Sequence, residues 1–285
     1  MSRPELIDTP AAMRDWSERH RLAGRRVGFV PTMGALHEGQ RALVDEARRH
    51  RDVVGVSVFV NPLQFDVRAD FDRYPRPIDD DLRACADAGV DAVYAPTAAA
   101  MYPPGFQTHV EPGPLAERLE GEHRPGHFRG VTTVVAKLFA AVRPHVAVFG
   151  QKDAQQLAVV RRMALDLDLG IEIVGMPTVR EPDGLALSSR NRRLGPEQRA
   201  AAVVVSRALR SIEESLRQGT TDATVLVRRA TEVIDAEPLA RLEHVEIVDP
   251  DTFEPVHTVD RPSLALAAVW YGEVRLIDNL LLSTG

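Results

Sequence analysis

The chain has 285 residues, 44% of them hydrophobic and 27% charged, which is the balance of a globular protein with room for two domains. The net charge of −6 and the pI of about 5.9 argue against a nucleic-acid or anionic-membrane partner, which would favour a basic face. Cys85 is the single cysteine, so no internal disulfide forms, as in a reducing cytoplasm. We see no signal peptide and no apolar run of ~20 residues, and therefore expect a cytoplasmic protein without a membrane span.

Short β-branched runs alternate with helical patterns over the first part of the chain. The expected strands are residues 26–30, 53–60, 92–95, 145–149 and 171–175. The expected helices are residues 41–50, 78–88, 132–142 and 153–167. This alternation predicts an α/β fold with a doubly wound parallel sheet that helices cover on both faces. Such sheets bind ligands beyond the carboxyl ends of their strands.

The pattern changes near Pro177. Two further helices are expected, at residues 196–217 and 222–236, and are followed by strands at residues 242–248, 263–271 and 273–277. This order predicts a smaller α+β unit. We therefore expect two domains, residues 1–177 and 178–285, with a boundary that is soft by several residues.

The segment PTMGALHEGQ, residues 31–40, follows the first long strand and begins a helix. A glycine-bearing turn before a helix can place backbone N–H groups and the positive helix end beside a phosphate. His37 is the candidate phosphate ligand, although a histidine on its own would be read as a surface loop residue. Gln40 can donate a hydrogen bond but cannot carry positive charge.

A second polar group follows the strand at residues 53–60. Gln64 comes after the Asn61–Pro62 turn, where its amide can hold a small polar ligand; an isolated glutamine would more simply be an exposed loop amide. Asp79, Asp80 and Asp81 open the next helix. There the helix dipole favours carboxylates, and contact with Mg²⁺ is the alternative role.

Residues 120–130 contain glycine and proline and are expected to form a loop. The loop carries His123, Arg124, His127 and Arg129. Basic groups on an otherwise acidic protein suggest capture of an anion such as a carboxylate. A solvated connection between two elements is the alternative.

The segment FGQKDAQQL again leaves a strand and enters a helix. Gly150 permits close approach of the backbone to a ligand, and Lys152 is a point charge suited to phosphate. Asp153 can cap the helix or accept from ribose hydroxyls. Gln156 is expected to face the same crevice as Gln64.

Ser188, Ser189 and Arg190 lie on a loop near the expected domain junction. Their hydroxyls and guanidinium form a compact set of phosphate donors, and closure of such a loop over a nucleotide would exclude water. The alternative is a local serine turn beside a surface arginine.

Together these segments resemble the pantoate–β-alanine ligases, the pantothenate synthetase family, which share an H-x-G-H signature with other nucleotidyltransferases. The resemblance runs from Pro31 to about Ile277. It is densest at PTMGALHEG, VFVNPLQF, DFDRYPR, HFRGVTTVVAKLF, FGQKD and PTVREPDGLALSSRN. It implies a Rossmann-like amino-terminal domain, a smaller carboxy-terminal α+β domain that acts as a lid, and a homodimer.

The resemblance also implies a reaction. The carboxylate of pantoate attacks the α-phosphorus of Mg-ATP to give pantoyl adenylate and pyrophosphate, and the amine of β-alanine then displaces AMP. ATP is thus the implied co-substrate and Mg²⁺ the implied cofactor. No residue needs to act as a covalent nucleophile, because positioning and electrostatic stabilisation supply most of the rate.

Roles for individual residues follow from the same resemblance. The implied catalytic residues are His37, Gln40, Lys152, Ser188, Ser189 and Arg190. The implied ATP-binding residues are Pro31, Met33, Gly39, Gly150, Lys152, Asp153, Val179, Ser188 and Arg190. The implied substrate-binding residues are Met33, Gln64, Arg124, His127 and Gln156. No residue is assigned as a metal ligand.

Two positions depart from the family pattern. Gln40 stands in place of the second signature histidine, and Ala154 in place of an aromatic residue. Loss of one transition-state donor costs a factor of about 10²–10³ in rate, but glutamine keeps an N–H donor, so we expect a working, slower adenylation. The alternatives are a related adenylate-forming ligase that uses another amine, a nucleotide- or pantoate-binding paralogue without turnover, and a glutamine introduced to trap a complex.

Overall fold

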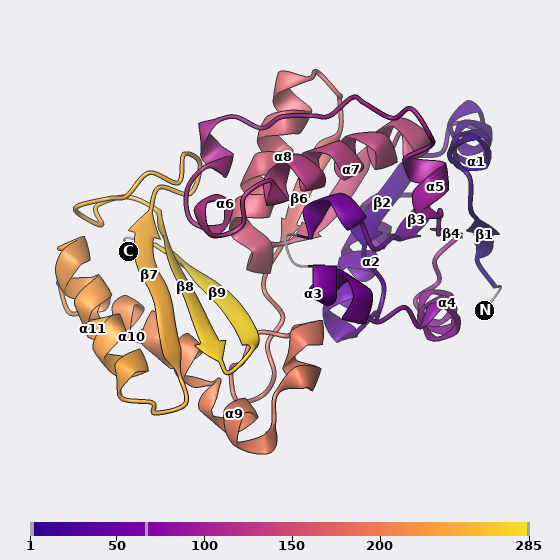
Figure 1. Ribbon diagram of the computed structural model, residues 1–285. Helices are drawn as coiled ribbons and strands as arrows, with labels where there is room; N and C mark the ends of the chain where they lie inside the picture. The colour runs from indigo at the N-terminus through magenta and orange to yellow at the C-terminus, as the bar shows by residue number, and fades with distance from the viewer. Residues whose placement is uncertain (1–2, 66–67, 284–285) are drawn as a thin grey trace. The chain divides into compact units, whose positions relative to one another are not determined.

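The computed structural model describes residues 3–65 and 68–283. The chain divides into two compact units (Figure 1). The N-terminal unit comprises Met1–Gln151 and Gln155–Pro177, and the C-terminal unit comprises Lys152–Ala154 and Thr178–Gly285.

The N-terminal unit is built around a six-stranded parallel sheet. Its strands are β1 (Glu5–Ile7), β2 (Val27–Thr32), β3 (Val53–Val58), β4 (Ala92–Tyr94), β5 (Val146–Gly150) and β6 (Glu172–Met176). They lie in the order β1-β4-β3-β2-β5-β6, and each pairing is parallel. Because β2 lies between β3 and β5, the segments that leave these three strands emerge next to one another at the carboxyl edge of the sheet.

Helices cover both faces of this sheet. They are α1 (Pro10–Leu22), α2 (Glu38–His50), α3 (Arg68–Arg73), α4 (Ile78–Asp87), α5 (Ala98–Met101), α6 (Glu120–His123), α7 (His127–Val142) and α8 (Ala154–Asp166). One core includes Trp16 of α1, Leu138 of α7 and Val160 of α8. A separate core includes Val44 of α2 and Leu82 of α4. The two cores on opposite faces confirm the predicted doubly wound sheet.

The C-terminal unit packs helices against an antiparallel sheet. Its strands are β7 (Arg241–Val248), β8 (Ser263–Tyr271) and β9 (Val274–Leu282), paired in that order. Its α-helices are α9 (Pro196–Ala201), α10 (Val204–Arg217) and α11 (Ala223–Asp235). Leu209 of α10, Leu226 of α11 and Val269 of β8 lie in one buried cluster, which confirms the predicted smaller α+β unit.

Several element boundaries differ from the sequence prediction. Residues 120–130, predicted to form a loop, instead contain α6 and the start of α7, with Gly126 between them at a φ of +80°. The predicted helix at residues 196–217 is two helices, α9 and α10. The short strand β1 and the helix α1, whose N-cap is Thr9, were not predicted. The break between α9 and α10 falls at Ala202 and Val203, where neither glycine nor proline signals it in the sequence.

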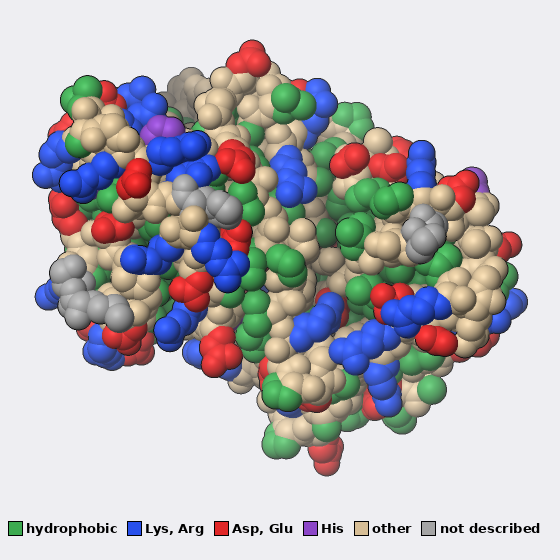
Figure 2. Space-filling model, turned by 180° about the vertical axis from the view of Figure 1, so that it is seen from behind, with side chains coloured by type: hydrophobic (Ala, Val, Ile, Leu, Met, Phe, Trp, Pro, Cys, Tyr) green, Lys and Arg blue, Asp and Glu red, His purple; other side chains and the backbone are tan. Residues whose placement is uncertain are grey.

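Acidic and basic side chains are interspersed over the face shown in Figure 2. Some form exposed pairs along a helix, such as Arg162 with Asp166, and such pairs contribute little to stability. Among residues 3–65 and 68–283, the helices lack the combination of length and apolar content that spanning a membrane requires.

His145, just before β5, couples the stability of the N-terminal unit to pH. Its Nδ1 accepts a hydrogen bond from the N–H of Val27 at 2.9 Å. Burial, together with the charges of Arg21, Arg26 and Arg51, lowers the pKa of His145 below its ordinary value of 6.5. As the pH falls, His145 is therefore protonated in the unfolded chain before it is protonated in the folded one. The stabilisation that neutral His145 contributes is fully present above pH 6.5 and decreases as the pH falls below that value.

We expect His145→Asn to flatten the decrease in melting temperature between about pH 7.5 and pH 5, because asparagine accepts a hydrogen bond without titrating. His145 is partly exposed, so the difference should be about 1–3 °C. Thermal unfolding followed by circular dichroism measures it. His257→Asn, at an exposed position of the C-terminal unit, is the control. Equal slopes for His145→Asn and the wild type would contradict the assignment.

Candidate active site

A buried carboxylate holds the loop that leaves β2. Asp81, in the first turn of α4, is 1% exposed. Its Oδ2 accepts from the N–H of Ala35 at 3.0 Å and its Oδ1 from the N–H of Leu36 at 2.7 Å. The turn has positive φ angles at Gly34 (+82°) and Ala35 (+52°). A Cβ on Gly34 would lie 2.7 Å from Oδ2 of Asp81, so the carboxylate and the glycine fit closely.

The three residues of the acidic triplet thus have different surroundings. Asp79 and Asp80 are exposed, and Asp80 forms an ion pair with Arg83. Asp81 is buried and binds the loop after β2, a role that the prediction of helix capping did not include. No local pattern marks Asp81, because its partner Ala35 lies 46 residues earlier in the chain.

His37 and Gln40 cap the start of α2 reciprocally. Nδ1 of His37 accepts from the N–H of Gly39 at 3.1 Å, and this bond assigns the proton of the neutral ring to Nε2. Oε1 of Gln40 accepts from the N–H of His37 at 3.0 Å, which completes a capping box. The oxygen of the Gln40 amide is therefore committed to the backbone, and its Nε2 is the donor end.

Several backbone amides of this loop donate within the chain, and binding of phosphate by the loop stays a prediction. The amide of Gly34 donates to Oγ1 of Thr32 at 3.1 Å. The amides of residues 35–37 and of Gly39 donate to Asp81, Gln40 and His37. The side chains of His37 and Gln40 lie at the positive end of α2, and each carries one N–H group besides the atom that caps the helix.

Four of the predicted substrate-binding residues come together after β3. Nε2 of Gln64 lies 3.2 Å from Sδ of Met33, which follows β2. The main-chain oxygen of Gln64 accepts from Nη2 of Arg124 at 3.2 Å and from Nδ1 of His127 at 2.8 Å. Nη1 of Arg124 lies 3.2 Å from Nε2 of His127, so this ring donates through Nδ1 and accepts at Nε2. Arg124 and His127 thus fix the backbone beside the Gln64 amide.

Asn61 organises this cluster, although the sequence indicated only a turn there. It is 1% exposed, and its Nδ2 donates to Oε1 of Gln64 and to the carbonyl of Gly130, both at 3.0 Å. Its Oδ1 accepts from the hydroxyl of Tyr102 at 2.7 Å. The 3₁₀-helix η1 (Pro62–Gln64) then packs on α7 so closely that a Cβ on Gly130 would lie 2.2 Å from the oxygen of Leu63.

Gly150 ends β5, the strand adjacent to β2. A Cβ at this glycine would meet no atom within 4 Å. Gln156 is half-buried in α8, and whether it faces Gln64 stays a prediction. Its neighbour Gln155 is 3% exposed. Gln155 accepts from the amide of Glu120 and donates to the main-chain oxygens of Leu115 and Arg118. The two adjacent glutamines thus differ in burial.

The remaining candidate residues belong to the C-terminal unit. Main-chain bonding between Val179 and Leu187, at 2.9 Å, closes a turn before the serine pair. Ser188 then begins the 3₁₀-helix η4 (Ser189–Arg193), and its Oγ accepts from the N–H of Arg190 at 3.2 Å. The local serine turn considered from the sequence is therefore present. It leaves the hydroxyl proton of Ser188 for donation to another group.

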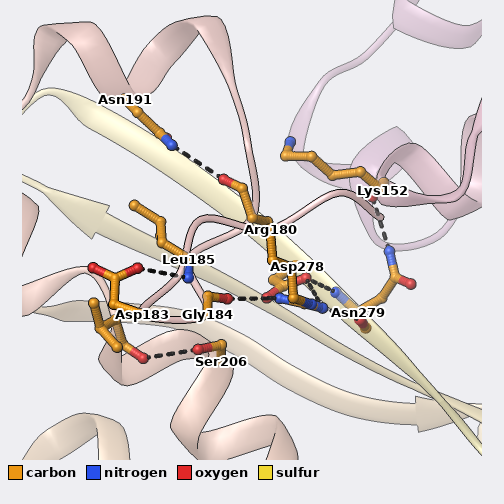
Figure 3. Close-up of polar contacts among 11 residues, drawn as sticks. Lys152, Arg180, Asp183, Gly184, Leu185, Asn191, Ser206, Asp278 and Asn279 are labelled. Atoms are coloured by element: carbon orange, nitrogen blue, oxygen red, sulfur yellow. Dashed lines mark hydrogen bonds and ion pairs between the residues drawn. The ribbon is translucent and has the colours of Figure 1, made fainter. Parts of the chain in front are cut away.

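A polar network from β9 supports these segments (Figure 3). Arg180 binds the buried carboxylate of Asp278 with both terminal nitrogens, at 2.6 and 2.9 Å, a bidentate geometry that fixes both groups. The same guanidinium donates to the carbonyl of Gly184 in the turn. The next residue of β9, Asn279, donates through Nδ2 to the main-chain oxygen of Lys152 at 2.9 Å. The network thus binds the main-chain oxygens of Gly184 and Lys152 and does not include the Lys152 ammonium.

Asn191 binds the turn that precedes the serine pair. Its Nδ2 donates to the main-chain oxygen of Ala186 at 3.1 Å and to Oε1 of Glu181 at 3.2 Å. Glu181 in turn accepts from Arg199 at 2.6 Å. Sequence reasoning did not single out Asn191, because an asparagine after Arg190 carries no signal of a contact with the preceding turn.

We expect Gly130→Ala to displace η1 and to lower the free energy of unfolding by about 1–3 kcal/mol, because the added methyl group would overlap the Leu63 carbonyl. Urea denaturation measures the change. Gly113→Ala is the matched control: a Cβ there would meet no atom within 4 Å, so its effect should stay within about 0.5 kcal/mol. Equal stability of the two variants would contradict the close packing of η1 on α7.

Comparison with known proteins identifies the family. The sequence profile of the pantoate-β-alanine ligases matches residues 5–281. A pantothenate synthetase of Heliobacterium modesticaldum is 52% identical over 276 residues, which cover 97% of this chain and 98% of that protein.

Solved structures agree with this match. The crystal structure of pantothenate synthetase from Thermus thermophilus has a TM-score of 0.93 at 47% identity and covers 98% of this chain and 100% of that one. That of pantoate-β-alanine ligase from Francisella tularensis, complexed with β-γ ATP and β-alanine, has a TM-score of 0.81 at 32% identity, with 99% of both chains covered. As its sequence motifs predict, the chain belongs to the pantoate–β-alanine ligase family.

Proposed function

We propose that this chain condenses pantoate with β-alanine through a pantoyl-adenylate intermediate, converting ATP to AMP and pyrophosphate. Family membership confirms the ATP-dependent ligase activity predicted from the motifs. One observation carries the mechanism: His37 and Gln40 each commit one polar atom to capping α2 and keep an N–H donor on the other. The β-alanine in the Francisella complex supports the same amine here, so the alternative of another amine is not favoured.

Adenylation is the first step. An ionised pantoate carboxylate attacks the α-phosphorus, and the bond from that phosphorus to the bridging oxygen breaks as pyrophosphate leaves. Negative charge grows on the departing pyrophosphate. The N–H groups of His37 and Gln40 stabilise this charge by hydrogen bonding, and Lys152 and Arg190 stabilise it as cations. No proton needs to move in this step, because carboxylates are ionised at neutral pH.

The pantoate site lies around Gln64 in this proposal. The amide of Gln64 binds the substrate, with Gln156 as a second amide and Met33 as an apolar wall. Arg124 and His127 contribute by fixing the Gln64 main chain. In the second step the neutral amine of β-alanine attacks the acyl carbon of the adenylate, the bond to AMP breaks, and the amine proton passes to solvent.

The proposal also assigns residues that bind the nucleotide. Lys152 holds the triphosphate together with the Ser188–Arg190 segment, and Asp153, which is exposed, accepts from the ribose. The residues proposed to line the rest of the nucleotide are Pro31, Met33, Gly39, Gly150 and Val179.

Mg²⁺ belongs to the same proposal. When bound to the phosphates, the ion would supply positive charge to offset the charge that develops on the leaving group. This hard cation keeps several waters and needs only one or two protein carboxylates. The exposed carboxylate of Asp79 fits that chemistry, whereas Asp80 forms an ion pair with Arg83 and both oxygens of Asp81 already accept backbone N–H groups.

We also propose a homodimer in the cytoplasm, with residues 178–285 forming a lid domain over residues 1–177. The single cysteine supports a reducing compartment. Cys85 is buried, and burial, with the nearby Asp81 charge, raises the pKa of its thiol to about 12. The thiol is therefore a poor nucleophile. Sedimentation equilibrium tests the dimer directly.

The primary test measures pyrophosphate release from ATP and pantoate, with and without β-alanine, and identifies the products by mass. We expect AMP and pantothenate. An adenylate that β-alanine cannot discharge would point to another amine. Binding of ATP with no pyrophosphate release would mean that the site does not turn over.

We expect two substitutions of Gln40 to change the adenylation rate in opposite directions. Gln40→Glu keeps the acceptor for the His37 N–H but places a negative charge where a donor stood, so the rate should fall by about 10²-fold or more with little change in melting temperature. Gln40→His supplies an imidazole that can carry charge, and should raise the rate by up to about 10²-fold.

Stopped-flow measurement of pyrophosphate release resolves this step. If Gln40→Glu retained the wild-type rate, the Gln40 amide would not contact the triphosphate. If Gln40→His gave no gain, glutamine would not limit the rate.

A further inference from the structure

We propose that Asp81 is a positioning residue for adenylation, which acts by fixing the loop that aims His37 and Gln40. The proposal rests on the function given above and extends it to a residue outside the predicted site. Asp81 touches neither side chain through the contacts described; it binds the main chain that precedes them.

The loop depends on an acceptor at this place. Its turn requires left-handed backbone at Gly34 and, less favourably, at Ala35, whose φ is +52°. A non-glycine residue in this region is strained and persists only where its surroundings hold it. The carboxylate of Asp81 receives the N–H of Ala35 itself and the N–H of Leu36, so it stabilises the strained conformation directly.

The same two bonds determine where α2 begins. Leu36 immediately precedes His37, the N-cap of the helix. A shift of the Leu36 amide would move the His37 backbone, and with it the bond to Oε1 of Gln40. Both donor atoms would then be displaced together, and displacement of reacting groups by about 1 Å can cost about 10²-fold in rate.

The position of α4 makes Asp81 a firm anchor. Leu82 and Cys85 of α4 lie in one buried cluster with Val44 of α2, so the two helices share a core on one face of the sheet. Asp81 projects from the first turn of α4 toward the loop between β2 and α2. The catalytic loop is thereby tied to the same packed face as the helix it begins.

A carboxylate suits this position better than an amide. Two N–H groups point at Asp81, and each of its oxygens accepts one of them. Asparagine offers one oxygen and one NH₂ group, so one loop amide would face a donor. Asp81→Asn therefore removes one of the two acceptors for the loop amides with little change in side-chain volume.

The test compares Asp81→Asn with Asp80→Asn. Asp80 lies one residue earlier on α4 and is exposed, so its variant controls for loss of charge in this helix turn. We expect Asp81→Asn to lower kcat for pantoate-dependent ATP–pyrophosphate exchange by about 10²-fold, while the KM for pantoate stays within about 2-fold, because the Gln64 cluster is untouched. Asp80→Asn should leave kcat near the wild-type value.

Two further measurements separate positioning from other roles. Hydrogen–deuterium exchange should accelerate in the peptide that contains residues 33–40 of Asp81→Asn and not of Asp80→Asn. The concentration of Mg²⁺ that gives half the maximal rate should be unchanged. Restoration of activity by excess Mg²⁺ would overturn the proposal and make Asp81 a metal ligand.

Unchanged kcat and unchanged exchange in folded Asp81→Asn would also overturn the proposal. If Asp81→Asn does not fold, Gly34→Ala tests the same contact from the loop, because its Cβ would press on Oδ2 of Asp81; it should lower kcat with a similar KM, and wild-type kcat in it would count against the anchor. If the wild type itself released no pyrophosphate, the proposed function would fail, whereas exchange of residues 33–40 would still report whether Asp81 holds the loop.

Discussion

The unpaired amides at the start of α2 are the constraint on which the site depends. A helix begins with N–H groups that have no partner inside the helix, and here side chains accept the N–H groups of His37 and Gly39 at the helix start. Asp81 takes two loop amides, and His37 and Gln40 take one each. Each capping side chain also has an N–H group on its other polar atom. The bonds that stabilise the helix start therefore also position the side chains of His37 and Gln40, the proposed catalytic donors.

This constraint explains how glutamine can occupy the place of the second signature histidine. The position requires an acceptor for the His37 N–H and a donor directed elsewhere. A carboxamide has one of each, as does a neutral imidazole. Gln40 thus preserves the local geometry, and what the substitution removes is the capacity for positive charge.

The sequence predicted the parts of this fold that depend on local pattern. Alternating runs indicated the parallel sheet and its two covered faces, whereas the site predicted after β2, β3 and β5 stays a proposal. Asp81 and Asn61 were missed as organising residues, because their partners Ala35 and Gly130 lie 46 and 69 residues away. Buried polar side chains take their meaning from such distant main-chain groups, which no spacing rule along the chain describes.

The same geometry indicates where the positive charge for adenylation must come from. Nδ1 of His37 accepts the Gly39 N–H, so a proton on that atom would set two donors against each other; the loop as built suits a neutral imidazole. Gln40 is neutral at any pH. In the proposed mechanism both side chains therefore stabilise growing phosphate charge as dipoles, and other groups supply the net positive charge. In the proposed mechanism these are Lys152, Arg190 and Mg²⁺, which makes precise placement of the Lys152 main chain by β9 as important to the reaction as the signature loop itself.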